Sequence, residues 1–303
     1  MSTAPRGVSP LPAQADPCYS VNCRALYVQF TALYVRPVSC LDTRLQWHLF
    51  HQPQPAAQEA MHKYRVGDIR RSYTPAKARA EWYGDWASAL IYRPLSFLLT
   101  PFFLSFSFSA SMVTLVSLTL GLALPLIAIY GGREAVWIVA VSATAWMVLD
   151  CVDGNIARVT NTSSLAGRYF DTATDVAFRG CFYIAIGILI DAGTGKGHSG
   201  LATCLAAGYA TMAARFCRFY YDGLSGTDVY SEEPEQSGAT HLTPARCLFA
   251  FLSGIDRLLP LMVFFAAYWH HLSWISWFLL IYGLGDFALS QFGISQSLRA
   301  KRG

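Results

Sequence analysis

The sequence predicts an all-α integral membrane protein with six transmembrane helices, preceded by a helix that lies in the membrane interface. Three observations support this prediction. The first is composition, because 53% of the 303 residues are hydrophobic and only 14% are charged, which is unusual for a soluble domain. The second is the recurrence of long apolar stretches, one of which carries no charge from residue 94 to residue 132. The third is that Lys and Arg gather near the ends of these stretches, as membrane orientation requires.

The chain before the first predicted span divides into two parts. Residues 1–60 form a poorly patterned tail, without an apolar run of the roughly 20 residues needed to cross a bilayer. In residues 61–106, basic residues alternate with Trp82, Tyr83 and Trp86. This mixture favours an interfacial helix, although a solvated linker would have a similar composition. Met61 is an alternative start, because every later argument uses residues beyond it.

Residues 107–303 are predicted to form a single six-helix membrane domain. The spans are expected at about 109–130, 135–160, 164–190, 201–221 and 255–268, with a sixth that ends near residue 296. Six spans place both termini on one side of the membrane, and the basic residues near both ends predict that this side is the cytoplasm. The net charge of +4 is mild and gives no sign of a nucleic-acid partner.

The end of the second predicted span carries two carboxylates, Asp150 and Asp153. Residues three, four and seven apart share a helical face, so Gly154 and Ala157 lie on the same face as the acids. Small residues there let a phosphate approach the backbone closely. The guanidinium of Arg158, one residue further on, could reach that phosphate.

The third predicted span begins with a second acidic stripe, in which Gly167, Asp171 and Asp175 recur every four residues. Two helices joined by a short turn can bring all four carboxylates together. Such a cluster repels itself unless cations lie between its members, and oxygen ligands at this density favour Mg²⁺ or Mn²⁺ together with a phosphate. The alternatives are a proton or cation pathway and a structural acid pair.

The combined pattern resembles the signature of the CDP-alcohol phosphotransferase (CDP-alcohol phosphatidyltransferase) family. Every residue that the signature specifies is present at its spacing: Asp150-x2-Asp153-Gly154-x2-Ala157-Arg158-x8-Gly167-x3-Asp171-x3-Asp175. The similarity extends from about residue 90 to the C-terminus through the predicted spans, and it does not cover residues 1–60. One departure is that many relatives carry a Pro-Asn pair shortly before Thr114, where this chain has Ser111 in place of Asn.

The resemblance implies an enzyme of phospholipid synthesis that displaces CMP from a CDP-alcohol, usually CDP-diacylglycerol, with an acceptor alcohol. It implies two metal ions, Mg²⁺ or Mn²⁺, bound by Asp150, Asp153 and Asp171. Asp175 either completes the metal site or acts as the base. The implied CDP-binding residues are Asp150, Asp153, Gly154, Ala157, Arg158 and Gly167, with Thr114 from the first span. The resemblance also implies a homodimer. The turn between the second and third predicted spans lies on the same side as the termini, which predicts a multi-pass protein of the cytoplasmic or inner membrane whose active site faces the cytoplasm.

The acceptor is less strongly encoded. Arg179 lies one turn beyond Asp175, and Arg215 and Arg218 lie three residues apart near the end of the fourth predicted span. Together they predict a pocket for a phosphorylated acceptor, such as glycerol 3-phosphate or an inositol phosphate. Arginines that reach from a helix end to the membrane surface would show the same spacing, and serine or another neutral alcohol remains an alternative acceptor.

Two further functions fit parts of the pattern. Within the same family, the CDP could activate a head group that is transferred to a lipid or another alcohol. A membrane cation transporter could use the four carboxylates as its pathway. The glycines and Arg158 favour an enzyme, because a cation pathway gains nothing evident from an arginine that reaches a phosphate.

Overall fold

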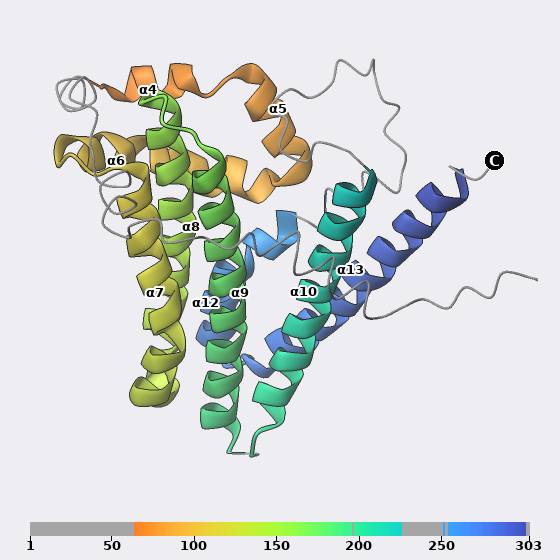
Figure 1. Ribbon diagram of the computed structural model, residues 1–303. Coiled ribbons are helices and arrows are strands. Elements are labelled where there is room, and N and C mark those ends of the chain that lie inside the picture. Colours follow the sequence, from red (N-terminus) through yellow and green to blue (C-terminus); the bar gives the residue numbers. More distant parts are fainter. Residues whose placement is uncertain (1–63, 196, 226–250, 252–253, 301–303) are drawn as a thin grey trace, which may run out of the picture. The chain divides into compact units, whose positions relative to one another are not determined.

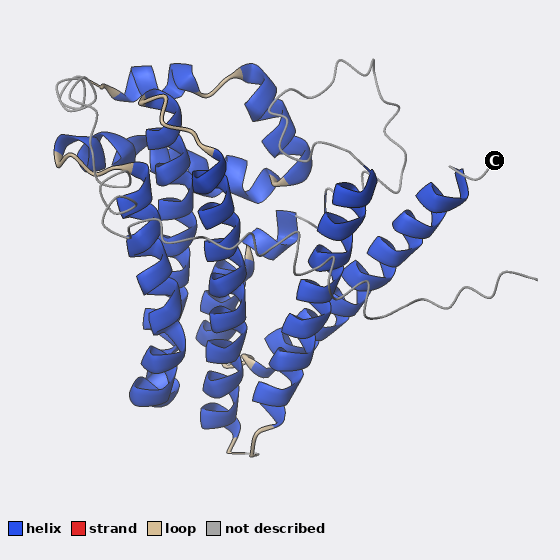
Figure 2. Ribbon diagram, in the orientation of Figure 1, coloured by secondary structure: helices blue, strands red, loops and turns tan. Residues whose placement is uncertain are grey.

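The computed structural model describes residues 64–195, 197–225, 251 and 254–300. Helices are the regular elements throughout this part of the chain, which contains no strand (Figure 2), so the all-α prediction is confirmed there. Every described residue belongs to one compact unit, which lies within Pro55–Gly303. The predicted tail, residues 1–60, and Met61 lie outside the described residues.

Four short helical elements precede the long helices. They are α4 (Val66–Ser72), α5 (Pro75–Gly84), the π-helical turn η1 (Ser88–Tyr92) and α6 (Arg93–Ser105). The start of α5 follows from its sequence, because the side chain of Thr74 accepts a hydrogen bond from the Lys77 backbone amide at 3.2 Å and a proline follows it. Figure 1 shows α4 and α6 lying across one end of α7 and α8, and contacts join α4 and α6 to α8.

Three long helices form the centre of this unit. They are α7 (Ala110–Gly131), α8 (Val136–Val159) and α9 (Leu165–Thr194), with the 3-10 turn η2 (Gly132–Ala135) between the first two. Their core includes Trp146 of α8 and Phe178 of α9, whose rings stack with centroids 3.9 Å apart. Ser164 caps α9, because its hydroxyl accepts a hydrogen bond from the Gly167 amide at 3.0 Å. The turn from α8 to α9 is therefore short, and the end of one helix adjoins the start of the other.

Three further helices complete the described part of the chain: α10 (Ser199–Ser225), α12 (Leu259–Tyr268) and α13 (Ser273–Ala300). The α10 helix packs between α9 and α13, and α12 packs against α8 (Figure 1). Glycine permits the close approach of α9 to α10, since a Cβ at Gly187 would lie 2.6 Å from the Leu201 Cα.

Four helical segments are long and apolar enough to cross a membrane: Ser88–Ser105, Ala110–Val159, Leu165–Thr194 and Ser273–Arg299. The second has 50 residues and contains both α7 and α8, which pack side by side. Of the other described helices, α10 is not among these four segments, and α12 has only 10 residues. The count of six spans therefore stays a prediction, as does an interfacial position for residues 61–106.

Candidate active site

The four predicted carboxylates lie where α8 ends and α9 begins. Asp150 and Asp153 belong to the last three turns of α8, and Asp171 and Asp175 to the first three turns of α9. Arg257 joins the two pairs, because its Nη1 atom lies 3.7 Å from Asp150 Oδ2 and 3.6 Å from Asp175 Oδ1. The structure thus brings together two acidic stripes that are separated in sequence by a turn.

Asp153 is a buried carboxylate, with 6% of its surface exposed. It accepts a hydrogen bond from the Thr114 hydroxyl at 2.7 Å and has no ion pair among the described residues. Thr114 lies on α7, so the first long helix reaches into the acidic cluster. A buried carboxylate without a cation is costly, and a divalent cation beside Asp153 would offset that cost.

The donor set of the cluster consists of carboxylate oxygens, which suit Mg²⁺ or Mn²⁺. Within the described ranges, no three Asp, Glu, His or Cys side chains converge closely enough to hold a metal ion as they stand. The chemistry of the ligands and the uncompensated charge of Asp153 nevertheless fit a divalent cation. Asp150, Asp153 and Asp171 are the residues that would hold it.

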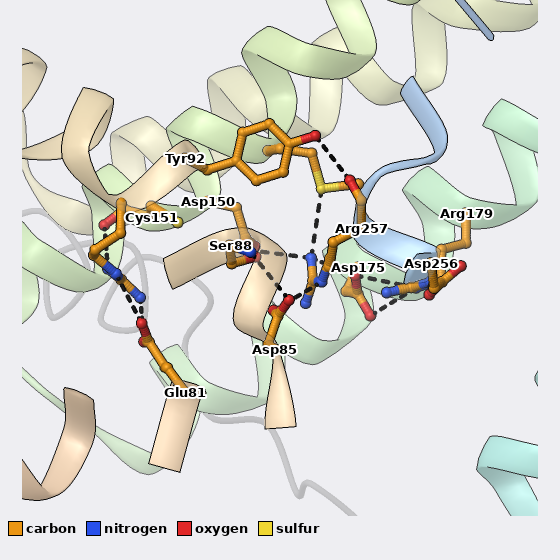
Figure 3. Close-up of polar contacts among 12 residues, drawn as sticks. Glu81, Asp85, Ser88, Tyr92, Asp150, Cys151, Asp175, Arg179, Asp256 and Arg257 are labelled. Carbon is orange, nitrogen blue, oxygen red and sulfur yellow. Dashed lines mark hydrogen bonds and ion pairs between the residues drawn. The ribbon is translucent and has the colours of Figure 1, made fainter. Parts of the chain in front are cut away.

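Asp175 is surrounded by arginines (Figure 3). Its Oδ2 atom accepts hydrogen bonds from Arg179 Nε at 3.1 Å and from Arg215 Nη1 at 3.0 Å. Its Oδ1 atom lies 3.6 Å from Arg257 Nη1. The predicted residues Arg179 and Arg215 therefore lie beside the acid that was predicted to serve as the base.

Arg257 links carboxylates from three parts of the chain. Its Nη1 atom lies 3.7 Å from Asp150 Oδ2, and its Nε atom lies 3.1 Å from Asp85 Oδ2, in the segment that joins α5 to η1. The hydroxyl of the fully buried Tyr92 donates to the Arg257 carbonyl oxygen at 2.8 Å. Sequence reasoning missed this arginine, and its only local signal is an Asp-Arg pair just before an apolar run.

Asp256, the other member of that pair, contacts two of the predicted arginines. It forms a close ion pair with Arg179 (Figure 3) and lies 3.6 Å from Arg215 Nη2. The third predicted arginine, Arg218, pairs instead with Asp286 of α13 at 2.7 Å. The structure thus groups Arg179 and Arg215 around Asp175 and Asp256 and ties Arg218 to a different carboxylate.

Arg158, the predicted phosphate-binding residue, forms a side-chain hydrogen bond through one of its guanidinium nitrogens. Its Nη2 atom donates to Asn155 Oδ1 at 2.8 Å, whereas its Nε atom is buried without a hydrogen-bond partner in the described structure. Gly154 lies against the guanidinium, because a Cβ there would be 3.4 Å from Nη1. A buried donor without a partner and a glycine beside it are what an incoming phosphate oxygen would use.

Asn155 is a fully buried hub that sequence reasoning did not identify. Its amide nitrogen donates to Ser96 Oγ at 2.9 Å and to Thr100 Oγ1 at 3.1 Å, and its oxygen also accepts from Arg93 Nη1 at 3.1 Å. These partners lie on α6, so α6 orients the residue that orients Arg158.

The other two predicted CDP-binding residues have backbone roles in the helix ends. The carbonyl oxygen of Ala157 accepts from the Thr162 amide at 2.9 Å, which helps to close α8. Gly167 donates its amide to the cap of α9. Both residues thus lie at the turn beside the acidic cluster.

Glu81 of α5 neutralises Arg93. The Glu81 Oε2 atom accepts from Arg93 Nε at 3.0 Å and from the Tyr73 hydroxyl at 2.6 Å. Burial by itself would raise the pKa of Glu81, but the charge of Arg93 and these hydrogen bonds outweigh it, so the pKa lies below its ordinary value of 4.5.

This pKa shift predicts a pH dependence of stability. A carboxylate with a lowered pKa in the folded state stabilises the fold above its ordinary pKa, and the contribution disappears as pH falls through the folded value. We expect Glu81→Gln to lower the Tm of the detergent-solubilised protein at neutral pH. The gap between wild type and variant should narrow as pH falls below about 4.5. A gap of constant size from pH 7 to pH 3 would contradict this assignment.

The fold and the site define a helical protein of membrane type, with carboxylates and arginines gathered at one helix–helix turn. Residues 107–231 match the family model of the CDP-alcohol phosphatidyltransferases, and this region of the chain is similar to that family. No curated protein matches the chain. For this region the match supports transfer of a substituted phosphate group from a CDP-alcohol, in a family that generally depends on a divalent metal ion.

Proposed function

We propose that the protein transfers a phosphatidyl group from CDP-diacylglycerol to an acceptor alcohol, with release of CMP. The observation that carries this proposal is the site at the α8–α9 turn. There, α8 and α9 carry four carboxylates, and Arg158 near the end of α8 has a buried Nε atom that lacks a partner among the described residues. A lipid-linked donor gives a reason for building this site in a bundle with helices long and apolar enough to cross a membrane.

In this proposal the donor's pyrophosphate lies between the metal-binding acids and Arg158. Asp150, Asp153 and Asp171 would hold one or two Mg²⁺ or Mn²⁺ ions, which, when bound, neutralise the pyrophosphate and the leaving CMP. Arg158 would bind a phosphate oxygen, and Gly154 leaves room for it. Thr114 supports the arrangement by holding the carboxylate of Asp153.

Asp175 is proposed to accept the proton of the acceptor hydroxyl. A base must lie within hydrogen-bonding distance of that hydroxyl, so the acceptor would lie on the side of the site that Arg179 and Arg215 line. The proposal retains the six spans, the homodimer and a site that faces the cytoplasm.

The arginines also bear on the transporter alternative. Three guanidinium groups lie within 3.6 Å of the Asp175 carboxylate. A pathway for cations past Asp175 would have to cross this concentration of positive charge. The contacts of Asp175 therefore favour the enzyme.

The direct test is CMP release by the purified protein in detergent with CDP-diacylglycerol. It should be run with Mg²⁺ or Mn²⁺, with a chelator as control, and with a panel of acceptor alcohols. Metal-dependent CMP release with one acceptor is expected. Binding of CDP-diacylglycerol without release would point to an alcohol outside the panel, and release from a CDP-linked head group instead would establish the alternative donor. Ion flux in liposomes without CMP release would contradict the proposal.

A further inference from the structure

We propose that Asp256 makes the enzyme select an acceptor alcohol without a phosphate group, because its carboxylate occupies the basic position that an acceptor phosphate would need. This inference rests on the proposed function, and it reverses the sequence-based expectation of a phosphorylated acceptor. It concerns the two arginines beside Asp175 and the residue that neutralises them.

The two arginines are already paired with carboxylates. Arg179 is 3% exposed and Asp256 is 7% exposed, and they form a close ion pair. Arg215 lies between two acids, at 3.0 Å from Asp175 and 3.6 Å from Asp256. A phosphate binds arginine well through a pair of parallel hydrogen bonds, and carboxylates hold those donors here.

The positive charge around this position is already neutralised by carboxylates. Arg257, the third guanidinium near Asp175, forms ion pairs with the carboxylates of Asp85, Asp150 and Asp175. Apart from Asp150, which belongs to the proposed metal site, three carboxylates therefore face the three guanidinium groups and balance their charge. A phosphorylated acceptor would bring more negative charge into a position where burial leaves charges poorly screened.

The position offers a neutral acceptor the carboxylate of Asp256 as a hydrogen-bond acceptor. The contacts of Asp256 with Arg179 and Arg215 are both made by its Oδ2 atom. A hydroxyl group can donate to a carboxylate oxygen, whereas a phosphate oxygen would be repelled by it. Asp256 shares both arginines with Asp175, the proposed base, and therefore lies next to the expected place of the acceptor hydroxyl.

A purely structural ion pair would also join the residues just before α12 to α9. Loss of such a pair would lower stability and would slow all acceptors alike. A role in selection instead changes the ratio between acceptors that differ only in a phosphate. That ratio separates the two roles.

The experiment compares matched acceptors: glycerol with glycerol 3-phosphate, inositol with inositol phosphate, and serine with phosphoserine. For the wild type, the neutral member of the productive pair should have the higher kcat/KM. Asp256→Asn keeps the shape of the side chain and removes its charge. We expect it to shift the ratio of kcat/KM toward the phosphorylated member by at least about tenfold. The matched control is Asp286→Asn, which removes the partner of Arg218 and should leave the ratio unchanged.

A second measurement does not depend on turnover. Inorganic phosphate should raise the Tm of Asp256→Asn above that of the same variant in chloride at equal ionic strength, and should not raise the Tm of the wild type. A wild type that prefers a phosphorylated acceptor, or that phosphate stabilises as much as it does the variant, would overturn the inference. An unchanged acceptor ratio in Asp256→Asn would also overturn it. If the wild type released no CMP from any CDP-alcohol, the proposed function would fail, and the phosphate measurement would still decide the charge argument. If the variant did not fold, the wild-type preference and its response to phosphate would decide it.

Discussion

Asp153→Asn is expected to lower kcat/KM for CMP release by about a hundredfold to a thousandfold. The reason is that Asp153 is a buried carboxylate without an ion pair among the described residues, and the amide would lose the charge that attracts the divalent cation. A loss of about 3–4 kcal/mol of metal-dependent stabilisation corresponds to that range. The measurement is CMP release as a function of Mg²⁺ or Mn²⁺ concentration, together with binding of CDP-diacylglycerol.

Both the affinity for the divalent cation and the affinity for CDP-diacylglycerol should fall in this variant. Thr114→Val provides a graded companion, because it removes only the hydroxyl that donates to Asp153, and a loss of about tenfold to a hundredfold is expected. Thr114→Ser should recover most of the activity. Asp191→Asn, near the opposite end of α9, is the matched acidic control, since the hydrogen bonds of Asp191 in the described part of the chain come from the backbone amides of Gly200 and Leu201. Full activity in Asp153→Asn would rule out the proposed metal site.

Asp175→Asn is expected to reduce turnover by about a hundredfold to ten-thousandfold, the range typical of a lost general base. Donor binding should be retained in this variant. The reason is that Arg179, Arg215 and Arg257 keep their charges, and with one carboxylate fewer they attract the anionic donor at least as well as before. The measurement pairs single-turnover CMP release with the affinity for CDP-diacylglycerol in the absence of acceptor.

The two asparagine variants therefore give opposite binding results under the same assay. If Asp175→Asn weakened donor binding in parallel with turnover, Asp175 would act as a metal ligand and not as the base. If it kept wild-type turnover, the acceptor proton would have to go to another group. Either result would leave the assignment of Asp153 intact.

The sequence could predict the acidic cluster because its order is local. Asp150 and Asp153 follow helical spacing, as do Asp171 and Asp175, and only a short turn separates the two pairs. The contact between Thr114 and Asp153 is less local, since the two residues come from neighbouring helices. Within the described residues, α7, α8 and α9 also begin within a few residues of their expected positions.

The partners of the cluster could not be predicted in this way. Arg257 meets Asp150 and Asp175 across 107 and 82 positions of the chain, and no periodicity links such distant residues. The same is true of Asn155 and Arg93, whose pairing depends on how α6 crosses α8. Apolar periodicity also gave no reason to separate Arg218 from Arg215, although their side chains meet acids from different helices.

The matched family region, residues 107–231, ends short of the contacts that complete its own site. Arg93, which fixes Asn155, precedes that region, and Asp256 and Arg257 follow it. A chimera that exchanged only the matched region with a relative would therefore pair native carboxylates with foreign arginines. We therefore expect the smallest region that keeps these contacts to be longer than the matched region, with α6 at one end and the residues just before α12 at the other.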